Sequence, residues 1–283
     1  MRALVRRQVV GATSWELATR VPAPPVARWV SAYHGYRERG AGPCLRREVS
    51  GARVVFILDL GPPILVRTPR DELRAPGFVA GLHDRYAETL HEGFQEGVQL
   101  DLSPIGARQL FGVPMHELTG RVVSLDALPF DRDVVDRVRA QPTWDARFDV
   151  LDGALARRFA ELAVPGRVTA WAVAQIEQAR GAVAIGALAR ELGYSAKHVT
   201  RLFHDYVGVG PKHYARLVRF DRLKAAADAA PGRSWADLAL AFGYYDQAHM
   251  AREVRLLTGL TPSELRAERA DVAFIQDLPI GGG

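Results

Sequence analysis

Hydrophobic and polar positions follow different repeats in the two halves of the chain. Before about residue 130 the apolar residues come in short runs, as in 53–61 and 94–102. In the second run Val98, Leu100 and Leu102 share one face. Short apolar or alternating runs bounded by Gly and Pro predict β-strands. Beyond residue 130 the apolar residues recur every three to four positions, which is the repeat of amphipathic helices.

Further strands are expected at 63–68 and 77–84. The Gly61-Pro62-Pro63 break lies directly between the apolar run 53–61 and the segment 63–68, so these two are expected to form a hairpin. The stretch 26–36 fits either a short helix or a strand.

Helical patterns begin at the end of this region. Ser103 and Pro104 predict the start of a short helix that ends at Gly112, because Ser caps and Pro begins helices. Residues 131–163 are expected to be helical and to bury two apolar stripes, namely Val134, Val135 and Val138, then Phe148, Leu151, Leu155 and Phe159. The Pro165-Gly166 break then marks a domain boundary. We expect an α+β chain with a β-rich domain at 1–130, a helical linker at 131–166 and an all-α domain at 167–270.

The all-α region is divided by Gly and Pro into about seven helices, and two of its segments, 185–208 and 235–259, share one pattern. Each has a small residue, then Gly four positions later, then an aromatic residue, a polar cap and a second amphipathic helix. The matching residues are Ala189 and Ala239, Gly193 and Gly243, Tyr194 and Tyr244, and Ser195 and Asp246.

This layout is what a helix-turn-helix requires. The small residue lets two helices approach closely, the Gly supplies a left-handed turn position, and the aromatic side chain is expected to pack under the turn. The second helix then buries one face and offers the other to the DNA major groove. The expected buried residues are Val199, Leu202, Phe203 and Tyr206 in the first unit, and Met250, Val254 and Leu257 in the second. The expected open residues are Lys197, Thr200, Arg201 and His204, and Gln247, Ala248, His249, Arg252 and Arg255.

A long helical segment, 211–229, lies between the two units. At about 1.5 Å per residue it spans nearly 30 Å. A rigid helix of that length would hold two reading helices about one DNA turn apart, roughly 34 Å.

Residues 180–266 resemble the DNA-binding domain of the AraC/XylS family of transcription regulators. The second unit carries the closest match, in Ala239, Gly243, Tyr244, Asp246, Gln247, His249, Arg252, Gly259-Leu260-Thr261-Pro262 and Leu265-Arg266. Val254 departs from the pattern, since the family usually has Phe there. The resemblance implies base-reading positions at Lys197, Thr200 and Arg201, and at Gln247, Ala248, His249 and Arg252. His204 and Arg255 are candidates for phosphate or water contacts.

The β-rich half, through 45–61 and 98–128, resembles the shortened cupin-like barrel of one AraC-like subgroup. That resemblance implies a sensing or dimerising role. The implied partners are double-stranded DNA, with RNA polymerase, a small-molecule effector and a second copy of the chain as further candidates.

Other candidate sites are weaker. His83, His91, Glu92 and His116 lack the spacing of a metal cupin, so the histidines are interpreted as scattered surface or loop residues, and no metal or cofactor is expected. Trp29, Tyr33, Tyr36, Phe56 and Phe94 either line a pocket or, as we favour, form ordinary core. Cys44, the single cysteine, has no evident base, and the sequence contains no GxSxG, P-loop or Rossmann motif. We therefore do not expect an enzyme.

The composition is compatible with a DNA-binding protein but does not by itself indicate one. The net charge of +5 is modest for a DNA-binding protein. The single cysteine and the lack of a signal peptide or an 18-residue apolar stretch indicate a cytoplasmic protein without a membrane span. The expected function is a sequence-specific, effector-responsive transcription regulator. An activator is expected, although the sequence leaves open whether the protein activates or represses. The alternative is a DNA-repair or modification protein that uses the AraC-like domain for targeting.

Overall fold

The computed structural model describes residues 2–49, 51–161 and 166–272. Within this part of the chain, the strands form two antiparallel sheets. The larger sheet has the order β1-β2-β3-β10-β5-β8-β11, and the smaller has the order β4-β9-β6-β7. The strands are β1 (Leu4–Val10), β2 (Thr13–Arg20), β3 (Val30–Arg39), β4 (Cys44–Glu48), β5 (Val54–Asp59), β6 (Leu65–Arg67), β7 (Glu72–Arg74), β8 (Gly77–Ala80), β9 (Ala87–His91), β10 (Phe94–Leu102) and β11 (Val122–Ser124).

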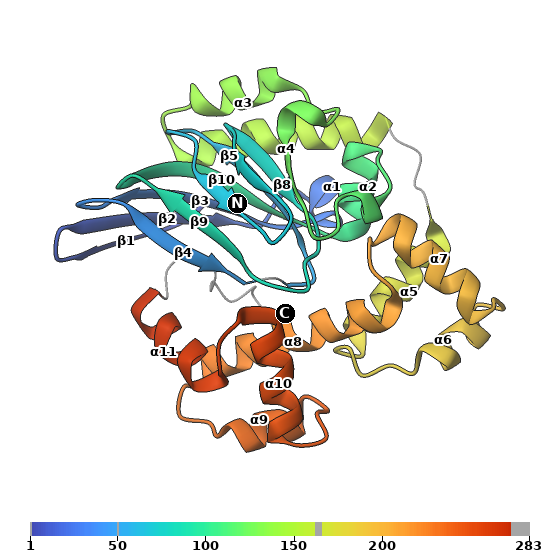
Figure 1. Cartoon of the computed structure of the whole chain (residues 1–283). Coiled ribbons are helices and arrows are strands. Elements are labelled where there is room, and N and C mark those ends of the chain that lie inside the picture. The colour runs from blue at the N-terminus through green and yellow to red at the C-terminus, as the bar shows by residue number, and fades with distance from the viewer. Residues whose placement is uncertain (1, 50, 162–165, 273–283) are drawn as a thin grey trace.

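Helices surround the sheets. Figure 1 shows α3 and α4 on one side of the β-rich part and the C-terminal helices on the other. The helices are α1 (Pro24–Ala27), α2 (Pro104–Phe111), α3 (Arg132–Arg139), α4 (Trp144–Glu161), α5 (Arg167–Gln178), α6 (Ile185–Glu191), α7 (Ala196–Tyr206), α8 (Pro211–Ala229), α9 (Trp235–Ala241), α10 (Gln247–Thr258) and α11 (Pro262–Val272), with short 3-10 turns η1 (Met115–Glu117) and η2 (Leu125–Ala127).

Strand β10 confirms the alternating pattern read from the sequence. It pairs with β3 on one side and β5 on the other, so it lies inside the larger sheet. Val98, Leu100 and Leu102 are fully buried. The stretch 26–36, which fitted either a short helix or a strand, contains both. Its first residues belong to α1 and its last residues to β3.

The predicted hairpin between 53–61 and 63–68 is wrong. Both segments form strands, but β5 pairs with β10 and β8 in the larger sheet, whereas β6 pairs with β7 and β9 in the smaller one. The Gly61-Pro62-Pro63 break therefore carries the chain from one sheet to the other. Consecutive prolines remove the N–H groups that a tight hairpin would need at its start.

The predicted helix after β10 is confirmed in detail. The Ser103 hydroxyl accepts a hydrogen bond from the Gly106 N–H at 3.1 Å, Pro104 opens α2, and Gly112 ends it with φ +69°. The predicted apolar stripes of α3 and α4 are also buried, with Phe148 and Leu151 fully enclosed. Of the predicted break, Gly166 lies at the start of α5 with φ +64°, while Pro165 falls outside the described residues.

The aromatic residues of the β-rich half are core, as we favoured from the sequence. Trp29, Tyr33, Tyr36 and Phe56 are all buried, and Phe94 is half-buried beneath the guanidinium of Arg39. Among the described residues, no helix is both long enough and apolar enough to cross a bilayer.

Candidate nucleic-acid interface

The first helix-turn-helix unit is α6, a short turn and α7. Gly193 has φ +70°, and the next residue, Tyr194, donates its backbone N–H to the carbonyl of Ala189 at 3.0 Å. The Ser195 hydroxyl then accepts the N–H of His198 at 3.2 Å and caps α7. The predicted turn chemistry is therefore present, because a left-handed glycine ends one helix and a polar cap begins the next.

Helix α7 has the two expected faces. Val199 and Phe203 are buried, whereas Leu202 and Tyr206, which were predicted to be buried, are only half-buried. Lys197, Arg201 and His204 are exposed. Thr200 is half-buried, and its hydroxyl donates to the backbone carbonyl of Ala196 at 2.9 Å.

The second unit, α9 to α10, repeats the same backbone geometry. Gly243 has φ +71°, and Tyr244 donates its N–H to the carbonyl of Ala239 at 3.0 Å. The Asp246 carboxylate accepts the N–H of His249 at 2.6 Å and caps α10. Two segments 50 residues apart thus form the same turn, which an unrelated bundle of short helices would have no reason to do.

The faces of α10 also match expectation. Met250, Val254 and Leu257 are fully buried. Of the residues predicted to be open, Gln247, Ala248, Arg252 and Arg255 are exposed. His249 is half-buried, and its Nδ1 accepts the N–H of Tyr245 at 3.4 Å.

The two turn tyrosines differ, which corrects the prediction that both pack under their turns. Tyr244 is 3% exposed, whereas Tyr194 is 41% exposed and stacks on the ring of His198 at 4.6 Å. The Tyr244 hydroxyl donates to Glu253 at 2.7 Å, and Arg219 of α8 donates to the other oxygen of the same carboxylate at 2.7 Å. Burial and the adjacent carboxylate raise the pKa of Tyr244 above its ordinary value. The sequence pattern did not identify Glu253 or Arg219.

Helix α8 joins the two units, as Figure 1 shows, with α6 and α7 near one end and α9 and α10 near the other. It has 19 residues, and at about 1.5 Å per residue it is about 28 Å long. Tyr214, Leu217 and Phe220 are fully buried along it. The helix is therefore anchored by a packed core, and the two units have a fixed separation.

The β-rich part contacts this helix and its neighbour α5. The backbone N–H of Ala52 donates to the Asp221 carboxylate at 2.8 Å, and Arg53 pairs with Glu177 at 3.1 Å. The same Glu177 oxygen accepts the hydroxyl of Tyr214 at 2.7 Å. Burial, the largest influence, raises the pKa of Asp221, although nearby cations and the Ala52 N–H act in the opposite sense.

The β-rich part also contacts the end of each helix-turn-helix unit. Gly208, which follows α7, has φ +95°, and Thr119 Oγ1 and the Met115 carbonyl occupy the space where a side chain would begin. Gly259, which follows α10, has φ +74°, and a Cβ there would lie 2.6 Å from the ring of Tyr86. Loops and turns of the β-rich part therefore contact the spacer helix and the residue that follows each reading unit.

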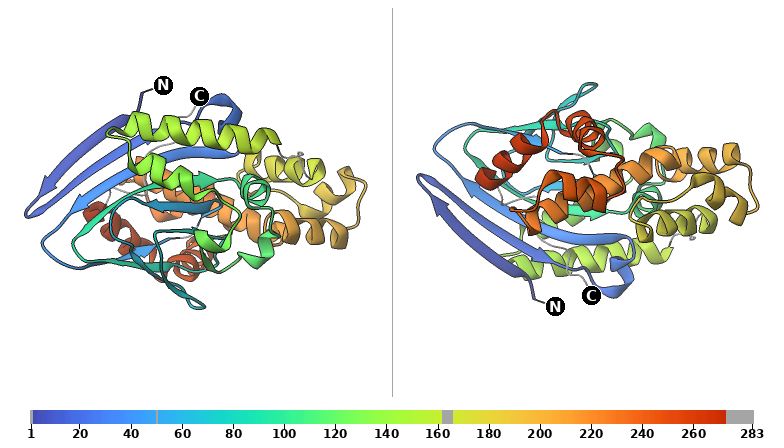
Figure 2. Two further views of the ribbon diagram at one scale, coloured as in Figure 1. Left: turned by 90° about the horizontal axis from the view of Figure 1, so that it is seen from above. Right: turned by 90° about the horizontal axis from the view of Figure 1, so that it is seen from below.

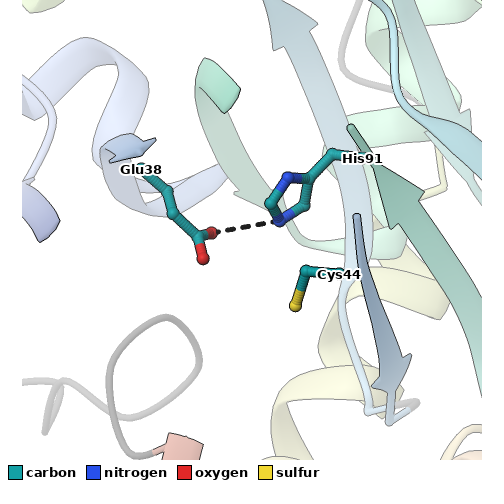
Figure 3. Close-up of side chains that lie close together, drawn as sticks. All are labelled: Glu38, Cys44 and His91. Carbon is teal, nitrogen blue, oxygen red and sulfur yellow. Dashed lines mark ion pairs between the residues drawn. The ribbon is translucent and has the colours of Figure 1, made fainter. Parts of the chain in front are cut away.

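A second group of reactive side chains lies inside the β-rich part, away from these helices. Figure 3 shows the Glu38 carboxylate facing the His91 ring, with Cys44 beside them, and one ligand atom of each residue lies within 4.8 Å of the other two. The sequence did not predict this grouping, because the three residues come from strands β3, β4 and β9. His91 is buried at the end of β9, which corrects its interpretation as a surface or loop residue, whereas His83 lies in a loop but is buried, and His116 is exposed.

The hydrogen bonds of this group indicate a buried ion cluster. Glu38 accepts two hydrogen bonds from Arg46 and one from Gln95, and lies 3.3 Å from His91 Nε2. Burial alone would raise the pKa of Glu38, but these partners outweigh it and lower the pKa to about 2. The Gly93 N–H donates to His91 Nδ1 at 3.2 Å, which places the proton of a neutral ring on Nε2, toward Glu38. His91 Nδ1 is therefore not free to act as a base for Cys44 or to bind a metal.

Comparisons with known proteins agree with the site. Residues 188–268 match the family model described as "Helix-turn-helix domain", the AraC-type form, which covers less than a third of the chain. No curated protein matches. A ToxT structure from Vibrio cholerae O395, bound to (E)-4-(8-methylnaphthalen-1-yl)but-3-enoic acid, aligns at 9% identity over 82% of this chain and 96% of that one, with a TM-score of 0.50. This likeness shows a shared fold.

Two further structures are similar over different lengths. A transcriptional regulator from Chromobacterium violaceum with an AraC-type DNA-binding domain aligns at 27% identity over 36% of this chain and 92% of that one, with a TM-score of 0.33. The AraC-like transcriptional activator CuxR aligns at 13% identity over 79% and 86%, with a TM-score of 0.31.

Proposed function

We propose that this transcription regulator, which carries an AraC-type helix-turn-helix DNA-binding domain in residues 188–268, reads two neighbouring stretches of the major groove with α7 and α10. One observation carries the proposal. The same turn, with a left-handed glycine, the same N–H to carbonyl bond and a polar cap, occurs at both ends of a single packed helix. Two such units about one DNA turn apart fit successive grooves on one face of the duplex.

The residues that read bases are proposed from their place on the two helices. The N-terminal part of a recognition helix enters the groove, so the first turns of α7 and α10 supply the base contacts. Arg201 and Arg252 are exposed and have the fork that binds guanine O6 and N7. The other proposed base contacts are Lys197, Thr200, Gln247, Ala248 and His249, with an apolar contact to a thymine methyl from Ala248.

His204 and Arg255 lie later on their helices and are exposed. We assign them to phosphate, since contacts to phosphate position a protein on DNA without reading sequence. Loss of either is then expected to weaken binding to all sequences alike and to flatten its salt dependence.

A gel-shift assay with the Arg201→Ala/Arg252→Ala double variant tests the base contacts. The loss of one bidentate contact to a base costs about 1–3 kcal/mol, so affinity for the specific site is expected to fall by about 5- to 150-fold for each arginine. The matched control is the double variant Arg137→Ala/Arg157→Ala, which removes the same two charges from exposed positions on α3 and α4. Unchanged specific affinity in the double variant would contradict the assignment.

The β-rich part is proposed to control this reading in response to a small-molecule effector. Support comes from its contacts with α8 and with the end of each unit, because an effector that moved the strands would change the separation of α7 and α10. We propose the division into 1–130, 131–166 and 167–270 on the same basis, with RNA polymerase as a partner and the cytoplasm as the location. Thermal shift in the presence of small organic acids, sugars and nucleotides tests the effector.

A further inference from the structure

Strand β1 is the outer strand of the larger sheet, and exposed apolar residues lie at both of its ends, on either side of Arg6, Arg7 and Gln8. All seven of its residues are exposed, including Leu4 at 55%, Val5 at 40%, Val9 at 73% and Val10 at 54%. Figures 1 and 2 show β1 at the rim of the molecule, remote from α7. Natural proteins usually cover, twist or charge a long edge strand, because its unpaired N–H and C=O groups form a template for another strand.

The turn that follows β1 determines which backbone groups face outward. Gly11, with φ +58°, is the first of two turn residues between Val10 and Thr13, which fits a type II′ hairpin. The flanking pair of such a hairpin exchanges hydrogen bonds, and the pattern then alternates along an antiparallel ladder. The N–H and C=O groups of Val5, Arg7 and Val9 are therefore the ones that point away from β2.

We propose that β1 pairs with the β1 of a second copy of this chain and joins two larger sheets edge to edge. The sequence of the strand, Leu-Val-Arg-Arg-Gln-Val-Val, is self-complementary about Arg7. A two-fold axis at Arg7 places Val5 of one copy opposite Val9 of the other and Leu4 opposite Val10. An isologous interface requires this reciprocity, in which residue i meets residue j and j meets i.

The groups that point outward are the ones that this axis requires. Val5, Arg7 and Val9 would form the hydrogen-bonded pairs of the new ladder, and they are the residues whose backbone groups are free. Like charges meet only at the axis, where each Arg7 already donates to Glu16 of its own strand pair at 2.5 Å. Registers centred on other residues overlap fewer positions and set arginine against valine, so the pattern selects this one.

The rest of the hairpin is held in place for such pairing. The backbone N–H of Ala3 donates to Asp145 of α4 at 2.6 Å, and Trp144 donates to Glu16 at 2.8 Å. The edge is thus presented by a strand that is fixed to α4. Dimerisation here is independent of DNA, so it can be tested apart from the proposed function.

Sedimentation equilibrium of the full chain without DNA provides the first test. The wild type is expected at twice the 31.1 kDa chain mass at micromolar concentration. Val9→Pro removes an outward N–H at each end of the ladder and is expected to weaken dimerisation by about tenfold or more. Val9→Thr keeps both the N–H and the branched shape and should leave the dimer intact. A monomeric wild type, or a Val9→Pro variant that dimerises equally well, overturns the proposal.

Cysteine cross-linking tests the register even if Val9→Pro fails to fold. In a Cys44→Ser background, Arg7→Cys places two thiols opposite each other at the axis, within disulfide reach. Arg6→Cys, one residue away and equally exposed, separates its two copies by more than the ~7 Å between Cα atoms that a disulfide spans. Rapid cross-linking of Arg7→Cys alone supports the register. Equal rates for both variants, or no cross-linking in either, overturn it.

Discussion

The Asp221 carboxylate, on the helix between the two reading units, accepts a hydrogen bond of 2.8 Å from the backbone N–H of Ala52 in the β-rich part. The two residues are far apart in sequence, and each belongs to a different half of the chain. The bond links the segment that precedes β5 to α8, the helix that joins the two reading units. Its loss should therefore be felt both in stability and in the geometry of DNA reading.

Asp221→Ala is expected to destabilise the protein by about 1–3 kcal/mol, because it leaves the buried N–H of Ala52 without its partner. Urea unfolding measures the change. The control is Glu191→Ala, which removes an acid from an exposed position on α6 and should change stability by no more than about 0.5 kcal/mol. Equal effects of the two substitutions would show that the contact contributes nothing.

The turn tyrosines give a matched pair of variants. Tyr244→Phe removes the hydroxyl that donates to buried Glu253 and is expected to cost about 1–3 kcal/mol. Tyr194→Phe removes an exposed hydroxyl and should cost less than about 0.5 kcal/mol, because the ring can still stack on His198. Thermal unfolding monitored by circular dichroism distinguishes them, and a larger loss for Tyr194→Phe would contradict the structure of the second unit.

The turn glycines are predicted to be required for backbone conformation alone. A Cβ at Gly193 or Gly243 would meet nothing within 4 Å, so Ala at either position is expected to cost only the strain of a positive φ, about 1–2 kcal/mol. Gly186→Ala, in the first turn of α6 and with equally open surroundings, should instead stabilise by about 0.4–1 kcal/mol. Chemical denaturation of the three variants tests this difference in sign.

Asp59 gives a prediction for pH. Burial raises its pKa from 3.8 to about 7, and hydrogen bonds from Ile64 and Tyr36 and the charge of Arg139 offset only part of that rise. Between these two values the folded state binds more protons than the unfolded state, so this carboxyl lowers stability as pH rises through the interval.

Asp59→Asn, which is neutral at every pH, is therefore expected to gain stability relative to the wild type from about pH 4 to pH 7 and then level off. The gain should be on the order of 1–4 kcal/mol. Urea unfolding of both proteins across this range gives the difference, which removes the titration of other groups such as His83. A flat or falling difference would contradict the assignment.

The features that the sequence predicted correctly depend on residues that lie close together along the chain. The turns at Gly193 and Gly243 and the caps at Ser195 and Asp246 involve contacts within a few residues, and all are present. The alternation of β10 also predicted its buried face correctly, because successive side chains of a strand point to opposite faces of the sheet.

Features that depend on distant parts of the chain were missed. The sheet that a strand joins is set by pairing across the fold, so β5 and β6 were wrongly joined. Tyr194 and Tyr244 occupy the same place in their motifs, yet only Tyr244 has a buried carboxylate beside it, which is supplied by Glu253 and held by Arg219 from another helix. The β1–β2 hairpin and the cluster around Glu38 gave no recognisable pattern in sequence.

Selection of bound sequences from randomised DNA, at one fixed salt concentration, tests the central claim most directly. The wild type is expected to select two blocks of bases whose centres lie about 10–10.5 base pairs apart. Arg201→Ala should relax the preference in one block only, and Arg252→Ala in the other only. A single selected block, or two blocks that neither variant changes, would contradict the account of two reading helices on one spacer.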